Sequence, residues 1–220
     1  LDNFCEIVEI FSDDKTLVPK IKAVSEKLKN SLIDAVKELH PEHVFKVPEE
    51  KSQACIQFLQ EYLNKNGLVF STNYDLLLYW VLMRNGADNA IDGFGRDLET
   101  DLDDGHYVEP DDLEYSELRW GKYKEEQTVY YLHGTLPIFD TGINIVKAQY
   151  DEEHYLLQNV KDRIDKKEYP IFVTAGNGKE KLTHIMHNKY LSFCYDQLCN
   201  IEGSLVTFGF NFGEYDTHII

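Results

Sequence analysis

The chain has 220 residues, enough for one domain with a full-sized core, and its 43% hydrophobic content is typical of globular proteins. A formal net charge of −17 argues against a nucleic-acid partner, because phosphate binding depends on clustered Lys and Arg. No apolar run reaches the roughly 18 residues that a membrane span needs. Four Cys without a CxxC pair indicate neither a zinc site nor a disulfide framework, so we expect a cytoplasmic protein with reduced thiols.

The first predicted elements are two amphipathic helices. Apolar residues recur in steps of three and four from Ile21 to Leu39, and Pro41 follows the end of this helix. A second helix is predicted from about Ser52 to Asn64, and Gly67 of the pair Asn66-Gly67 suits the left-handed conformation that ends helices. Its inward residues are expected to be Cys55, Phe58, Leu59, Tyr62 and Leu63.

Short strands and helices alternate over the rest of the chain. Strands are predicted in LVFSTN (68–73), TVYYLHG (128–134), YPIFVTAG (169–176) and SLVTFGF (204–210). Helices are predicted over 74–84, around 151–166, and as one long helix over 179–200. Strands that lack clean alternation and are separated by helices predict an α/β fold with a parallel sheet covered on both faces.

Residues 85–127 contain a strongly acidic segment, which we expect to be an insertion in the domain. From Asp88 to Glu117 there are twelve acidic residues and one basic residue, Arg96. Such a segment is typical of a solvated loop. A metal-binding loop is the alternative, although the acids around Gly105 lack the spacing of an EF-hand.

Small and polar residues gather where the predicted strands end: Thr72-Asn73, His133-Gly134, Ala175-Gly176 and Gly209. In parallel α/β sheets the ligand lies at the carboxyl ends of the strands. The pattern therefore indicates a crevice for a nucleotide-like ligand.

Each of these polar residues also has a structural explanation, and the residue chemistry leaves both open. Asn73 can hold a ribose hydroxyl or a water, or occupy a turn. Asp75 can accept a hydrogen bond from a ligand, or cap the following helix. His133 can act as a general base, with Gly134 allowing close approach, or be a satisfied structural histidine.

Three further features carry similar alternatives. Gly176 and Gly178 can present backbone N–H groups to a phosphate, or form a plain turn. A P-loop is excluded, because Val173 stands where that motif requires Gly and Glu180 stands where it requires Ser or Thr. Asp216 can contact a ligand or cap a terminal helix. The two histidines at 184 and 187 are three residues apart, but they lack a third ligand, so a solvated helix face is favoured.

Four stretches, taken together, resemble the sequence blocks of the SIR2-like superfamily, and most closely the bacterial DUF4917 family. They are STNYD, YYLHGTLPIF, YPIFVTAGNGKEKL and VTFGFNFGEYDTHI, and they occur in that order. The resemblance implies a Rossmann-like parallel sheet, flanked by helices, that binds NAD. The Gly-rich phosphate loop that opens the SIR2 fold has no counterpart and would precede Leu1. Residues 1–220 are therefore expected to be a single domain that is a fragment lacking the N-terminal strand and this loop.

The resemblance also implies roles for individual residues. Thr72, Asn73 and Asp75 match a segment whose Asn holds a ribose hydroxyl or a water and whose Asp lies near the nicotinamide. His133 and Gly134 match the catalytic histidine and the glycine after it. The late strand exit that contacts the cofactor matches Gly209 and Asn211, with Asn in place of the family's Ser.

The expected function is hydrolysis of NAD to nicotinamide and ADP-ribose, without a metal. No four-cysteine zinc module follows His133, which weakens a protein-deacylase alternative, and SIR2-like domains without this module occur in bacterial anti-phage systems. Asn73 and His133 would be catalytic, while Gly176 and Asp216 would join the NAD-contacting residues. A non-catalytic module that senses a nucleotide or forms homo-oligomers is the alternative.

Overall fold

A computed structural model describes residues 8, 16–24, 27, 31, 41, 44–96, 98, 99, 114, 115, 117–148, 156–166, 168–173 and 176–219. The chain divides into two compact units, Leu1–His43 and Val44–Ile220. In the first unit residues 17–24, 27 and 31 are helical, while the rest of the helix predicted from Ile21 to Leu39 lies outside the described residues. No helix in the described part of the chain is both long and apolar enough to cross a membrane.

The second unit is a mixed α/β structure that contains a small parallel sheet. Strand β1 (Val69–Ser71) pairs in parallel with β6 (Val129–Tyr131), and Ser71 lies opposite Tyr131. All three residues of β6 are buried, whereas β1 is half-buried. Both strands were predicted, and their shared direction brings the residues that follow them to the same edge of the sheet.

A second, larger sheet is antiparallel, so of the strands predicted for one parallel sheet only β1 and β6 pair in parallel. Its five strands lie in the order β2-β5-β8-β7-β9. Only two residues separate β6 from β7, and a tight turn from Thr141 to Asn144 leads into β8. Connections this short leave no room for the helical crossover that parallel neighbours require. The strand bounds are β2 (Phe94–Gly95), β5 (Leu118–Trp120), β7 (Gly134–Asp140), β8 (Ile145–Lys147) and β9 (Tyr169–Phe172), and β3 (Leu98–Glu99) pairs with β4 (Glu114–Tyr115).

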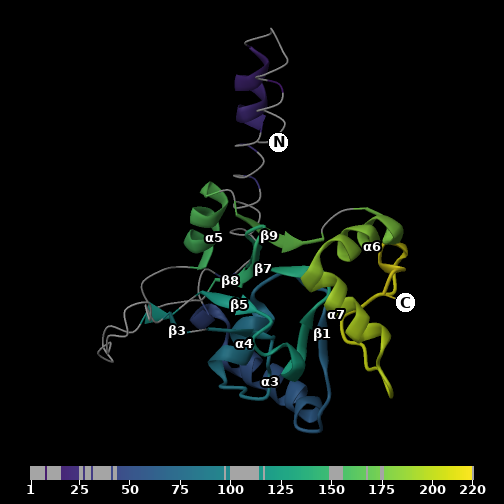
Figure 1. The fold of residues 1–220 in the computed structure, drawn as a ribbon. Coiled ribbons are helices and arrows are strands. Elements are labelled where there is room, and N and C mark those ends of the chain that lie inside the picture. Colours follow the sequence, from purple (N-terminus) through teal and green to yellow (C-terminus); the bar gives the residue numbers. More distant parts are fainter. Residues whose placement is uncertain are drawn as a thin grey trace. The chain divides into compact units, whose positions relative to one another are not determined.

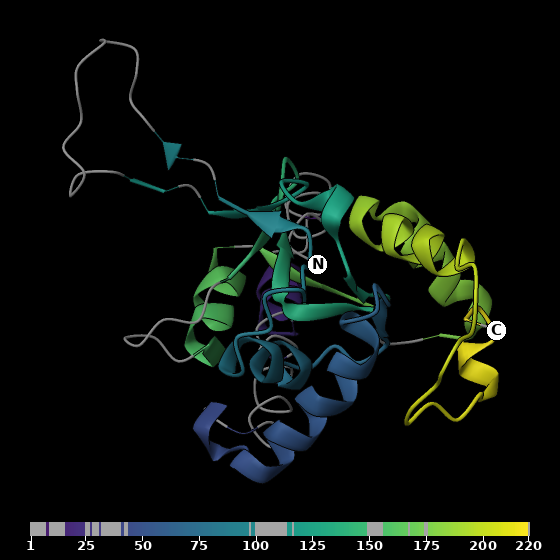
Figure 2. The same cartoon turned by 90° about the horizontal axis from the view of Figure 1, so that it is seen from below.

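Helices flank both sheets (Figures 1 and 2). Helix α3 packs on α4 and β1, α7 packs on β6, and α5 packs on β7 and β9. The parallel pair thus lies between α3 and α7, and its buried strand β6 supplies Val129, Tyr130 and Tyr131 to the hydrophobic core. The helices are α3 (Glu49–Leu63), α4 (Leu77–Arg84), α5 (Leu156–Asp165), α6 (Gly178–His187) and α7 (Lys189–Cys199), with 3-10 turns η1 (Val44–Lys46), η4 (Lys124–Glu126) and η5 (Glu214–Asp216).

Helix α3 is confirmed, but its buried face differs from the prediction. Leu59 and Leu63 are buried as predicted, whereas Cys55 and Phe58 are exposed and Ile56 is buried in their place. The helix ends in a Schellman motif, in which Gly67 N donates to the Tyr62 carbonyl at 2.9 Å. The left-handed residue of this motif is Asn66, with φ of 59°, and not Gly67 as predicted.

The long helix predicted over 179–200 is two helices, because the chain is extended at Asn188 (φ −110°, ψ 126°). The Asn188 side chain accepts hydrogen bonds from Tyr190 N and Leu191 N, so it caps α7 and ends α6. The strand predicted over 204–210 is also absent from the structure. Leu205 and Phe208 in this segment are exposed, and without a partner strand their β propensity forms no ladder.

The described parts of residues 85–127, predicted to be a solvated insertion, contribute to the fold. Phe94 of β2 is buried in the core, and the ring of Trp120 in β5 packs edge-on against Tyr190. Asp92 forms an ion pair with the buried Lys147 of β8. Residues 100–113, which hold six more acidic residues, lie outside the described residues.

Candidate functional site

The exits of β1 and β6 lie side by side and bring two of the predicted motifs together. Pairing continues one residue beyond the strands, because Leu132 N donates to the Ser71 carbonyl at 2.8 Å. The next residues, Thr72 and His133, are joined by a 3.1 Å contact between the Thr72 carbonyl and His133 Nδ1. Thr72 and His133 therefore lie side by side at one edge of the parallel pair.

Gly134 allows the chain to turn from β6 into the second sheet directly after His133. Its φ is +76°, a conformation that L side chains rarely adopt. A Cβ at this position would lie 1.9 Å from the Ile171 carbonyl oxygen of β9. The close approach that Gly134 was expected to allow is thus made by the backbone of β9 at Ile171. The His133 carbonyl accepts from Val173 N at 2.9 Å, which fixes this residue between the two sheets.

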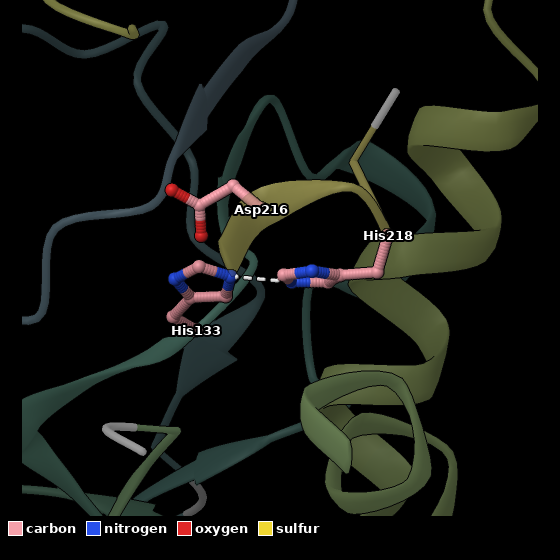
Figure 3. A group of neighbouring side chains, drawn as sticks. All are labelled: His133, Asp216 and His218. Carbon is pink, nitrogen blue, oxygen red and sulfur yellow. Dashed lines mark hydrogen bonds between the residues drawn. The ribbon is translucent and has the colours of Figure 1, made fainter. Parts of the chain in front are cut away.

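The C-terminal segment brings His218 and Asp216 to His133 (Figure 3). The Nε2 atoms of His133 and His218 are 2.8 Å apart, and ligand atoms of the two rings and of the Asp216 carboxylate all lie within 4.8 Å of one another. Both histidines are buried. Tyr195 of α7 holds the backbone in place by donating its hydroxyl to the His218 carbonyl at 2.8 Å.

The hydrogen bonds determine which ring nitrogens carry protons. A carbonyl oxygen only accepts, so His133 Nδ1 carries a hydrogen and donates it to Thr72. In the neutral ring His133 Nε2 then has a lone pair, and His218 Nε2 must be the donor across the 2.8 Å contact. This leaves His218 Nδ1 as an unprotonated nitrogen, buried and without a hydrogen-bond partner in the described structure.

The surroundings keep this pair of histidines neutral. Burial lowers the pKa of His133 to about 4, helped by the charges of His218 and Lys181 and opposed by Asp216 and the Thr72 carbonyl. Burial and Lys181 likewise lower the pKa of His218. Neutral rings at physiological pH keep lone pairs available for a proton or a metal ion.

Lys181 of α6 forms an ion pair with Asp216, with 2.8 Å between Nζ and Oδ1. Partial burial raises the pKa of Asp216, but the hydrogen bond and the charge of Lys181 outweigh this and lower it overall. Asp216 is therefore a carboxylate at neutral pH. The structural alternative was that Asp216 caps a helix; in the structure its side chain bonds to Lys181 instead.

Asn73 and Asp75 follow β1, beside this cluster. Asn73 is exposed, and its backbone N–H donates to Ser71 Oγ at 3.2 Å, so it lies in a local turn with its side chain facing solvent. Asp75 Oδ1 accepts from Leu77 N at 2.8 Å, a local turn around Leu76, the N-cap residue of α4. The Asp75 side chain thus bonds to the start of α4, while Asn73 is accessible to a ligand.

The turn before α6 is organised by a capping box. Asn177 Oδ1 accepts from Glu180 N at 3.1 Å, and Glu180 Oε2 accepts from Asn177 N at 2.9 Å. Two of the N–H groups that a phosphate would need are therefore already bonded. Gly176 has φ of +107° and packs on Glu180, as the alternative of a plain turn predicts. Gly178 packs closely on Thr217, which joins this turn to the segment that carries His218.

Two predicted cofactor residues lie apart from the cluster. Gly209 is exposed, and no described atom lies within 4 Å of the position of a Cβ there. Asn211 is exposed as well, and its side chain accepts from Gly213 N at 3.1 Å. The exposed His184 and His187 occupy a solvated helix face, as favoured from the sequence.

A separate cavity of about 260 Å³ lies beside α4 and is lined by residues that include Tyr79, Asp92, Tyr131 and Lys147. Its one charged pair is the Lys147–Asp92 ion pair, in which each group satisfies the other. None of His133, Asp216 and His218 lines this cavity, so we take the cluster at His133 as the candidate site.

Sequence reasoning overlooked His218 and Lys181. His218 follows Asp216 by two residues at the end of the fourth motif, so its position in that motif was the available signal. Lys181 stands in the third motif among other charged residues of a helix, where nothing in the pattern distinguishes it.

Comparison with known proteins identifies a family for nearly the whole chain. A family model described as "Domain of unknown function (DUF4917)" matches residues 8–220. No curated protein and no solved structure matches the chain.

Proposed function

The chain belongs to the DUF4917 family, and we propose that it is a SIR2-like NAD-binding domain that hydrolyses NAD to nicotinamide and ADP-ribose. One observation carries the proposal: residues from all four motifs that resemble SIR2-like blocks meet at His133. Thr72 belongs to the first motif and Asp216 to the last, and both contact or approach the His133 ring. Gly178 of the third motif packs against Thr217, beside them.

The chemistry required for this reaction is modest. Nicotinamide leaves from an oxocarbenium-like centre, so the protein needs to position a water and stabilise positive charge rather than supply a strong acid. Asn73 orients the water or a ribose hydroxyl, and neutral His133 accepts its proton. The Asp216 carboxylate lies close enough to stabilise the imidazolium that results.

A second candidate is a module that binds NAD or a related nucleotide without turnover. One observation favours it: the lone pair of His133 Nε2 is occupied by the hydrogen bond from His218. A base in this position has to exchange His218 for the substrate hydroxyl before it accepts a proton. A purely binding site needs no such exchange.

Comparison of three proteins separates the two candidates: wild type, Asn73→Ala and His133→Ala. Nicotinamide and ADP-ribose are quantified by chromatography after incubation with NAD, and NAD binding is measured by calorimetry. Hydrolysis predicts release by the wild type and at least a hundredfold loss in both variants with binding retained. Binding without release by the wild type selects the second candidate. Absence of both release and binding rejects both.

A further inference from the structure

We propose that His133, His218 and Asp216 form a binding site for a divalent transition-metal ion, with Zn²⁺ as the best-fitting ion. The ligands are the two facing Nε2 atoms and one carboxylate oxygen. His133 comes from the exit of β6, whereas the other two come from η5 and the residues after it. The site thus joins the C-terminal segment to the parallel strand pair.

The spacing of the three side chains suits one ion. Zn²⁺ binds imidazole nitrogen at about 2.0–2.1 Å, which places two tetrahedral ligands roughly 3.3 Å apart. The two Nε2 atoms are 2.8 Å apart, so an opening of a few tenths of an ångström admits the ion between them. The carboxylate lies within the 4.8 Å span of the cluster and needs only a small side-chain movement to become the third ligand.

The protonation pattern also suits a metal. Histidine ligands characteristically donate their second ring N–H to a carbonyl or carboxylate, which orients the ring. His133 does this through Nδ1 and the Thr72 carbonyl, so its Nε2 lone pair points at His218. The ion takes the place of the single hydrogen between the two Nε2 atoms, and His218 stays neutral by carrying a hydrogen on Nδ1 instead.

The donor set narrows the choice of ion. Two imidazoles and one carboxylate favour Zn²⁺ and similar borderline ions over Mg²⁺ and Ca²⁺, which prefer oxygen ligands. Three protein ligands leave a fourth position for water. The Asp216 side chain is 25% exposed, which gives the ion a route from solvent.

Lys181 sets the strength of the site. Its ammonium group is bonded to Asp216 Oδ1, which leaves the other carboxylate oxygen for the ion. A positive charge this close repels a divalent cation, so affinity is lower than the ligands alone would give. Removal of the charge in Lys181→Met is therefore expected to tighten binding.

This site does not depend on NAD hydrolysis. An ion bound at His133 Nε2 occupies the lone pair that a general base requires, so metal binding and base catalysis exclude one another. If the protein hydrolyses NAD, the ion is expected to inhibit it. Metal binding itself is measurable whether or not NAD is turned over.

The test is calorimetric titration of Zn²⁺ into the full chain with a non-thiol reductant present. We expect one site in the wild type, at least tenfold weaker binding in His218→Gln, and tighter binding in Lys181→Met. The matched control is the double variant His184→Gln/His187→Gln, which removes two exposed histidines of α6 and should leave the affinity unchanged. His218→Cys should restore binding through a thiolate ligand.

A Co²⁺ absorption spectrum distinguishes the cluster from exposed thiols such as Cys55 and Cys199. Wild type is expected to show visible bands of a nitrogen and oxygen site, and His218→Cys a new sulfur charge-transfer band. Circular dichroism verifies that each variant is folded. The proposal is overturned by unchanged affinity in folded His218→Gln, by loss of the site in the α6 double control, or by no binding to the wild type.

Discussion

His133 and His218 are 85 positions apart in the sequence, yet their Nε2 atoms face one another at 2.8 Å. The contact depends on two anchors. The positive φ of Gly134 lets the chain turn from β6 into β7, and the Tyr195 hydroxyl donates a hydrogen bond to the His218 carbonyl. The site is therefore a product of the junction between the two sheets and of the way the C-terminal segment returns to it.

Gly134→Ala should be strongly destabilising, because the new methyl group would lie 1.9 Å from the Ile171 carbonyl oxygen in a left-handed conformation. We expect the free energy of unfolding, measured by urea denaturation, to fall by more than about 3 kcal/mol. Gly142→Ala is the control: its φ is +82°, but no atom lies near its Cβ, so about 1–2 kcal/mol is expected. Equal losses in the two variants would show that the backbone contact with Ile171 is not tight.

Asn188→Ala tests the break between α6 and α7. Asn188 accepts from the backbone of Tyr190 and Leu191, so its loss should lower the free energy of unfolding by about 1 kcal/mol. Asn177→Ala, which removes the cap of α6, should cost a similar amount. If residues 179–200 formed one continuous helix, Asn188→Ala would instead raise the free energy of unfolding, because Ala is a better helix former than Asn. An increase would therefore contradict the break at Asn188.

Cys194 should resist alkylation in the native protein. Burial raises the pKa of its thiol to about 12, so at pH 8 about one molecule in ten thousand carries the reactive thiolate. The rate of any native-state reaction should rise about tenfold per pH unit toward this pKa. The exposed Cys199 serves as the internal control and should react first, as followed by peptide mass spectrometry. Reaction of Cys194 as fast as Cys199 in the folded protein would contradict its burial.

The sequence was sufficient for elements whose signals are local. The periodicity of α3, the apolar run of β6 and the polar residues after β1 and β6 are all visible in short windows, and these elements formed where predicted. Even there, the buried face of α3 was misjudged. Cys55 and Phe58 are apolar residues like Ile56, and the packing of α3 on α4 and β1 decides which side is covered.

The sheet arrangement was not predictable from these local signals. Strand β7, the longest described strand, was overlooked; Pro137 in its middle argues against a strand, and Pro is tolerated where the pairing of β7 with β9 is irregular. Residues 204–210 have strong β propensity but no partner strand in the structure. In both cases pairing with distant residues outweighed propensity.

The part of the candidate site that follows the two parallel strands was predictable from the sequence, whereas the part supplied by the C-terminal segment was not. His133, Thr72 and Asn73 follow two strands that pair in parallel, so their proximity follows from topology. His218 reaches the site from a segment without regular structure, held by Tyr195 and by the fit of Thr217 against Gly178. No sequence periodicity reports such contacts.

The central claim, that a nucleotide binds where the four motifs meet, is tested most directly by NMR of the histidine rings. The ring signals are assigned with single His→Gln variants and recorded during titration with a carbocyclic NAD analogue that cannot be cleaved. We predict saturable shifts of the His133 and His218 signals, with the exposed His184 and His187 unchanged. An analogue that binds without moving the His133 and His218 signals, or that does not bind, would contradict a nucleotide site at this junction.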